Sequence, residues 1–105
     1  MASDEHVAAA LADFAKEVMR SSREYVGTGR ILSLDQEAIR RRRLQELATE
    51  AEAMATNPRA ATYRAFERSL REVQQLGVQI ESETIIRVAS AFMQRPHVGL
   101  GKPGK

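Results

Sequence analysis

The sequence contains no cysteine and no tryptophan, and histidine occurs only twice. The lack of cysteine excludes disulfide bonds and metal sites with thiolate ligands. His6 and His97 lie near opposite ends of the 105-residue chain, and we expect both to be exposed rather than to act as ligands or bases. No Glu-x-x-His pair is present, which excludes the di-iron site common in helical bundles. We therefore expect no catalytic residue, no metal and no cofactor.

Long hydrophobic runs are also missing. The longest apolar run, VAAALA at 7–12, is too short for the core of a signal peptide or for a membrane span. The preceding segment, MASDEH, is acidic where a secretory signal would be basic. These features predict a cytoplasmic protein that does not enter a membrane.

Aromatic residues make up only 5% of the sequence, so alanine must fill much of the core, which favours closely packed helices. The formal net charge is only +2, but it is unevenly distributed along the chain. Residues 1–58 carry 8 basic and 10 acidic side chains, whereas residues 59–105 carry 8 basic and 4 acidic ones. A basic surface that meets an anionic partner is therefore expected in the C-terminal half.

Apolar residues recur at spacings of three and four along almost the whole chain, and no segment alternates long enough to form a convincing strand. We predict an all-α fold, either a small four-helix bundle or a long antiparallel helical hairpin with flanking helices. In this prediction residues 1–95 form a single helical domain. Residues 96–105, rich in Gly, Pro and Lys, form a flexible basic tail.

Capping residues predict where the first helix begins and ends. Ser3 is the expected N-cap, and the helix runs to about Val26 because Gly27 follows. Its expected buried face consists of Val7, Leu11, Phe14, Val18, Met19 and Tyr25. Its expected solvent face carries Asp13, Lys16, Glu17, Arg20 and Glu24.

Similar signals predict three further helices. The second begins after a Ser33 cap and ends near Asn57, which in turn caps a third helix starting at Pro58. The second and third helices are expected to form a tight antiparallel hairpin. The third buries Tyr63, Phe66, Leu70 and Val73, and ends at Leu76 before a left-handed Gly77 onto which Val78 folds back. After a short extended connector at 78–81, the fourth helix is capped by Ser82 and presents a wide apolar face made of Ile85, Ile86, Val88, Ala89, Phe92 and Met93.

The stretch IRRRRLQEL, residues 39–47, contains four consecutive arginines. Successive residues lie about 100° apart around a helix, so the four side chains point in different directions and form no single patch. Glutamates one or two turns away are expected to pair with three of them: Glu37 with Arg41, Glu46 with Arg42, and Glu46 or Glu50 with Arg43. We interpret the run as a solvated helix face. Arg40 instead extends the stripe of Leu44, Leu47, Ala51 and Met54, where it either lies at the edge of the core or meets a carboxylate from another helix or subunit.

A more promising basic surface lies on the third predicted helix. Arg64, Arg68 and Arg71, which we call the arginine row, are followed by Gln75 at spacings of 4, 3 and 4, so all four share one solvent-facing side. Two interpretations stay open: the row is neutralised by Glu67 and Glu72, or it is free to meet phosphates. Arg59, Lys102 and Lys105 could extend it. No aromatic residues alternate with the arginines, so base stacking has no support in the pattern.

These observations lead to two hypotheses about function. The first is a non-enzymatic assembly subunit of a larger nucleoprotein complex, in which the arginine row and basic tail contact DNA or RNA backbone. The second is an inhibitor or adaptor that docks on an acidic or nucleic-acid-binding protein surface without nucleic acid. In either case the expected interface with a protein partner or a second copy consists of Arg40, Ile85, Ile86, Phe92 and Met93. Nothing in the sequence indicates a small-molecule substrate.

Overall fold

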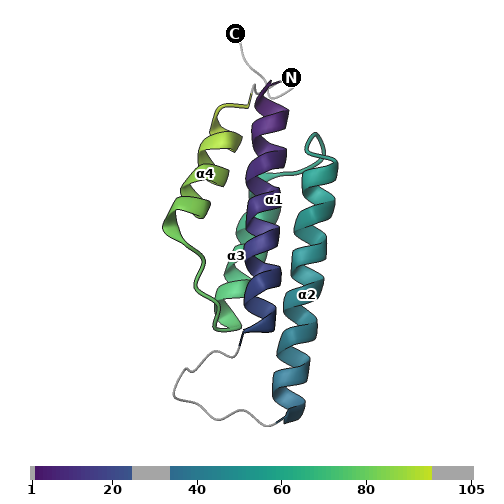
Figure 1. The fold of residues 1–105 in the computed structure, drawn as a ribbon. Coiled ribbons are helices and arrows are strands. Elements are labelled where there is room, and N and C mark those ends of the chain that lie inside the picture. Colours follow the sequence, from purple (N-terminus) through teal and green to yellow (C-terminus); the bar gives the residue numbers. More distant parts are fainter. Residues whose placement is uncertain (1, 25–33, 96–105) are drawn as a thin grey trace.

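A computed structural model shows the fold and describes residues 2–24 and 34–95 (Figure 1). These residues contain four helices and no strand, which confirms the predicted all-α bundle. Within the same residues no helix combines the length and apolarity needed to cross a membrane. The helices are α1 (Ala2–Arg23), α2 (Leu34–Thr56), α3 (Tyr63–Gln75) and α4 (Ser82–Met93).

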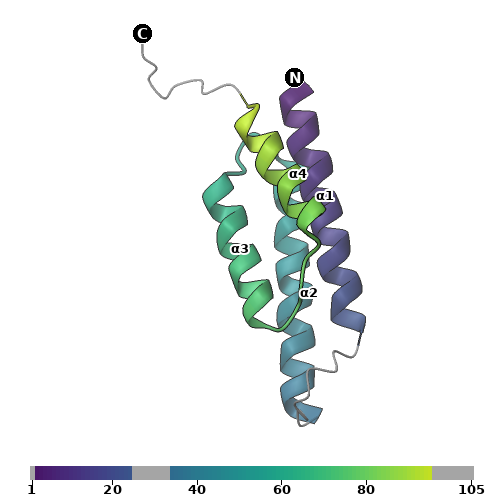
Figure 2. The same ribbon diagram turned by 90° about the vertical axis from the view of Figure 1, so that its left-hand side faces the viewer.

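The two long helices, α1 and α2, lie side by side and run in opposite directions (Figures 1 and 2). Helix α3 returns antiparallel to α2, as predicted, while the shorter α4 packs against α1 at the end where α1 begins. The longest helix pair of the bundle is thus formed by α1 and α2 rather than by α2 and α3.

The core lies between these helices and is built largely from alanine and branched aliphatic side chains. Two fully buried aromatic rings mark its centre: Phe14 of α1 and Phe66 of α3 meet edge to face, with ring centroids 5.0 Å apart. This contact holds α3 against α1. Other fully buried residues are Val7, Leu11, Val18, Leu44, Leu47, Ala48, Ala51, Val73 and Val88.

The predicted ends of α1 need correction. The helix already includes Ala2, so Ser3 is not its N-cap, and it ends at Arg23 rather than near Val26. The start of α2 at Leu34 agrees with the predicted boundary. Tyr25, Gly27 and Ser33, to which we assigned a core position and two caps, lie outside the described residues.

The prediction that α3 begins at Pro58 is wrong, because the helix begins at Tyr63. Thr62 is its N-cap, and the Thr62 hydroxyl accepts a hydrogen bond of 3.1 Å from the Ala65 amide. The preceding residues form turns instead of a helix. The Pro58 carbonyl accepts a turn hydrogen bond from the Ala61 amide over 3.2 Å, and Arg95, which follows α4, donates to the carbonyls of both Pro58 and Ala61.

The predicted end of α3 is confirmed. Gly77 has a φ of +88°, and the amide of the buried Val78 donates to the carbonyl of Val73 over 3.2 Å. Residues 78–81 form an extended connector, as expected from their alternation, with Val78 and Ile80 buried.

Helix α4 is capped by a residue from another helix. Its N-cap is Glu81, not Ser82, and the Glu81 side chain makes no capping bond. Glu17 of α1 serves instead: its carboxylate accepts from the Glu81 amide over 2.8 Å and from the Thr84 hydroxyl over 2.7 Å. Glu17 was predicted to face solvent, but it is buried, and its negative charge lies at the positive end of the α4 dipole.

Candidate nucleic-acid interface

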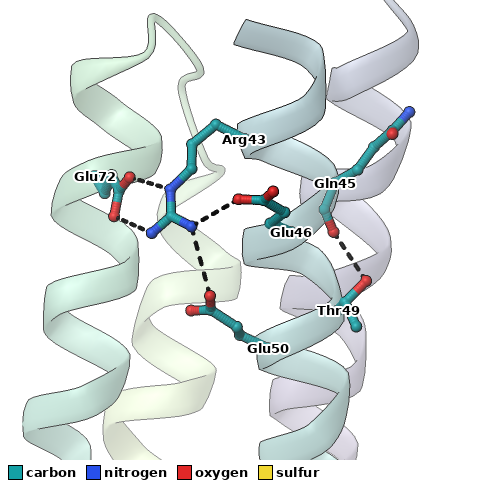
Figure 3. A network of polar contacts seen from close by, with 6 residues as sticks. All are labelled: Arg43, Gln45, Glu46, Thr49, Glu50 and Glu72. Carbon is teal, nitrogen blue, oxygen red and sulfur yellow. Dashed lines mark hydrogen bonds and ion pairs between the residues drawn. The ribbon is translucent and has the colours of Figure 1, made fainter. Parts of the chain in front are cut away.

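The arginine run on α2 is largely neutralised by carboxylates, as predicted. Arg43 lies between two helices (Figure 3) and pairs with Glu46 at 3.0 Å and Glu50 at 3.6 Å on its own helix. It also forms a two-pronged contact with Glu72 of α3, in which the Arg43 Nη2 to Glu72 Oε1 distance is 2.8 Å. In one of the two open interpretations of the arginine row, Glu72 pairs with Arg68. Glu72 instead binds the planar guanidinium of Arg43, which leaves Arg68 without this partner.

The contact between Arg43 and Glu72 predicts a pH dependence of stability. Hydrogen bonding from the Arg43 guanidinium lowers the pKa of the Glu72 carboxyl below its usual value. The folded state therefore binds fewer protons than the unfolded state at acid pH, so the stabilisation is present above the usual glutamate pKa and is lost as pH falls through the lowered value. We expect a coupling of about 0.5–1 kcal/mol at neutral pH, because both side chains are about one-third exposed.

A double-mutant cycle with Arg43→Gln and Glu72→Gln, followed by urea unfolding, measures this coupling. The coupling should be present near pH 7 and smaller near pH 3, because Glu72 becomes protonated as pH falls. An equal coupling at the two pH values would contradict the ionic nature of the contact.

The other three arginines of the run differ in their surroundings. Arg41 pairs with Glu37 at 3.0 Å, as predicted, but the predicted pair of Arg42 with Glu46 is wrong: Glu46 binds Arg43, and Arg42 has no ion pair within the described residues.

Arg40 is buried, with 7% of its surface exposed. Its Nε donates to the carbonyl of Leu76, the C-cap of α3, over 2.9 Å, and its Nη1 lies 3.3 Å from Glu37. Of the two alternatives for Arg40, a carboxylate from another helix is not found in this chain: the partner from another helix is a backbone carbonyl, and the carboxylate, Glu37, belongs to α2 itself. A cation at the end of α3 is favourable for the helix dipole. Because it is buried inside the chain, Arg40 is not available as part of an interface, and that assignment is corrected.

The arginine row lies on the surface of α3 that faces away from the core. All three of its side chains are exposed, and each is separated from the buried Phe66 by about 140–160° around the helix. None has an ion pair or a side-chain hydrogen bond with another described residue. The predicted alternative pairs with Glu67 and Glu72 do not form. The row is therefore free to contact an anion.

The position of the row on α3 does not favour helix stability. Arg64 lies in the first turn, which contains no acidic residue and where the helix dipole disfavours a cation. Arg68 follows one turn later, and like charges at this spacing repel each other. An anionic partner would remove both costs.

The remaining residues proposed for this surface fall into two groups. Gln75 is exposed at the last turn of α3, and Arg59 is exposed in the turn before the helix begins. Lys102 and Lys105, the proposed contribution of the tail, lie outside the described residues, as does His97.

The apolar face of α4 is only partly covered. Phe92 is buried and Ile85 is half-buried against the core, so these two are less accessible than the proposed interface requires. Ile86 and Met93 are 62% and 79% exposed. Ile86 and Met93 lie seven residues apart on the same side of α4, and we call them the apolar edge.

A pocket adjoins this edge and was missed by the sequence analysis. It is lined by Tyr63 of α3 and by Ala89, Phe92 and Met93 of α4. Tyr63 was expected in the core but is 39% exposed, because its ring lies at the end of the aromatic cluster, 5.8 Å from the ring of Phe92. The pocket joins residues far apart in the sequence, so no local pattern could reveal it.

Acidic and histidine side chains do not gather elsewhere into a metal site. Across residues 2–24 and 34–95 no group of three or more such side chains is placed to hold a metal ion. Comparison with known proteins finds no family model, no curated protein and no solved structure that matches this chain. The function must therefore be argued from the surfaces described above.

Proposed function

We propose that this chain is a non-enzymatic helical subunit of a nucleoprotein assembly that binds the phosphate backbone of nucleic acid through the arginine row of α3. The observation that carries the proposal is the exposure of Arg64, Arg68 and Arg71 on one side of a helix without a carboxylate partner among the described residues. Backbone contacts of this kind supply affinity without reading the sequence.

Other arginines of the chain support the argument by contrast. Arg43, Arg87 and Arg95 each pair with carboxylates or carbonyls that tie one helix or turn to another. Their side chains thus have a structural explanation. The arginine row has none, and its charges cost helix stability rather than adding to it.

Binding of random-sequence DNA and RNA across a salt series tests the proposal. Three phosphate contacts give a log–log slope of affinity against salt of about −2 to −3. The R64Q/R68Q/R71Q variant should raise Kd at least about tenfold at low salt, because each lost contact removes a counterion-release contribution. Fluorescence anisotropy of a labelled oligonucleotide measures both quantities.

Two control variants show whether the effect belongs to the row. R64K/R68K/R71K keeps the charges and should retain most of the affinity. Arg42→Gln removes another exposed, unpaired arginine from α2 and should leave Kd unchanged. The proposal would fail if the wild-type chain did not bind at low salt, or if the triple glutamine variant bound as well as wild type.

A protein-binding adaptor or inhibitor is the second candidate, and the apolar edge of α4 favours it. Ile86 and Met93 expose large apolar side chains next to the pocket lined by Tyr63 and Phe92, a combination typical of surfaces that contact another protein. The same titration separates the candidates, because an adaptor of this kind has no affinity for nucleic acid at any salt concentration. In the first function, this edge is the surface through which the subunit assembles.

A further inference from the structure

A second basic row lies on α1. Lys16, Arg20 and Arg23 follow one another at spacings of 4 and 3, and all three are exposed. They are separated from the buried Phe14 by about 120–180° around α1, so they face away from the core. We call these residues the α1 row. None of them has an ion pair or side-chain hydrogen bond with another described residue.

Two acidic residues that could neutralise the α1 row are used elsewhere in the fold. Asp13, one turn before Lys16, pairs with Arg87 of α4 at 2.9 Å. Glu17, one turn before Arg20, is buried at the start of α4, where it accepts hydrogen bonds from Glu81 and Thr84. Packing α4 against α1 thus buries Glu17 and pairs Asp13 with Arg87, so neither carboxylate pairs with the α1 row. Glu24 is the one exposed carboxylate within a turn after Arg20, so the row keeps a positive excess.

The helix dipole explains only part of this arrangement. Arg20 and Arg23 lie in the last turn of α1, where cations are favourable. Lys16 lies outside that turn, and like charges three and four residues apart repel one another.

The two basic rows face opposite sides of the molecule. Phe14 of α1 and Phe66 of α3 touch, with ring centroids 5.0 Å apart, so each ring points toward the other helix. Each row stands on the far side of its helix from that contact. Figure 2 shows α3 and α1 on opposite flanks of the bundle, with α2 and α4 between them. One nucleic-acid segment lying along the α3 row therefore leaves the α1 row accessible.

We propose that the α1 row is a second site for the phosphate backbone, so that one chain bridges two nucleic-acid segments. This inference rests on the proposed function of the α3 row. The occupant follows from charge complementarity: three cations along one helix, with no apolar side chain among them, fit a continuous row of phosphates. The α1 row is the weaker site, because Arg20 and Arg23 lie in the last turn of α1, where the negative end of the helix dipole disfavours an anion.

Energy transfer between two populations of short DNA duplexes, one labelled with a donor and one with an acceptor, tests the inference. We expect wild-type protein, with duplex at a concentration that saturates both sites, to raise the transfer efficiency well above that of the same duplexes without protein. K16Q/R20Q/R23Q should still bind duplex through the α3 row, with Kd changed less than about threefold, but should lose the transfer. The charge-retaining variant K16R/R20K/R23K should keep it.

The outcomes separate this inference from the function on which it rests. Wild-type protein that binds duplex without energy transfer, or K16Q/R20Q/R23Q that still bridges, would overturn the bridging role and leave the α3 row as the binding site. Absence of duplex binding by wild-type protein would overturn both. Circular dichroism of each variant should match wild type, since all three substituted side chains are exposed.

Discussion

Replacing Phe66 with alanine is expected to lower the free energy of unfolding by about 3–5 kcal/mol. The ring is fully buried and meets the equally buried Phe14 edge to face, so the substitution removes buried apolar surface and leaves a cavity between α1 and α3. A domain of this size is stable by only about 5–15 kcal/mol in total, so the loss is a large fraction. Urea unfolding followed by circular dichroism measures it.

Two further variants show whether the aromatic contact causes the loss. Phe66→Leu keeps most of the side-chain volume and should cost clearly less than Phe66→Ala. Tyr63→Ala removes a partly exposed ring from the same helix and should also cost less. A loss below about 1 kcal/mol for Phe66→Ala would mean that α3 is held to the bundle by other contacts.

Glu17→Ala is expected to destabilise the protein by about 2–3 kcal/mol. The variant leaves the Glu81 amide and the Thr84 hydroxyl without their acceptor, and it removes a negative charge from the start of α4. For a domain of this length the change corresponds to a fall in Tm of about 10 °C, which thermal unfolding measures.

The matched control is Glu24→Ala, which removes an exposed carboxylate just after the same helix and should shift stability by less than about 0.5 kcal/mol. Glu17→Gln keeps one carbonyl oxygen as acceptor, so its loss of stability should lie between those of Glu17→Ala and Glu24→Ala. If Glu17→Ala behaved like Glu24→Ala, the cap on α4 would contribute nothing measurable.

Local sequence signals predicted the presence of the four helices and the end of α3, because those signals act within one or two turns. The end of α3 could be predicted from Gly77, because glycine readily adopts the left-handed conformation found there, and from the apolar Val78 that follows it. The exposure of the arginine row follows in the same way from its spacing against Phe66. Both depend on residues that are neighbours in sequence.

Predictions failed where a distant residue decides the local structure. The sequence places Glu17 on the polar side of α1, and only packing brings the start of α4 against it. Pro58 is favourable at a helix start but lies in a turn instead, where its carbonyl accepts from the Ala61 amide and from the distant Arg95. Glu72 has an arginine one turn away on its own helix, yet Arg43 from α2 offers a better two-pronged geometry.

The arginine side-chain Nε–H resonances of labelled protein, followed by NMR during addition of duplex DNA, test the central claim most directly. Our account predicts that the signals of Arg64, Arg68 and Arg71 shift at the lowest DNA ratios and recover when salt is added. The Arg43 signal should stay in place, because Glu72 holds that guanidinium. Shifts confined to the apolar edge of α4, or no shift in the arginine row at low salt, would contradict the account.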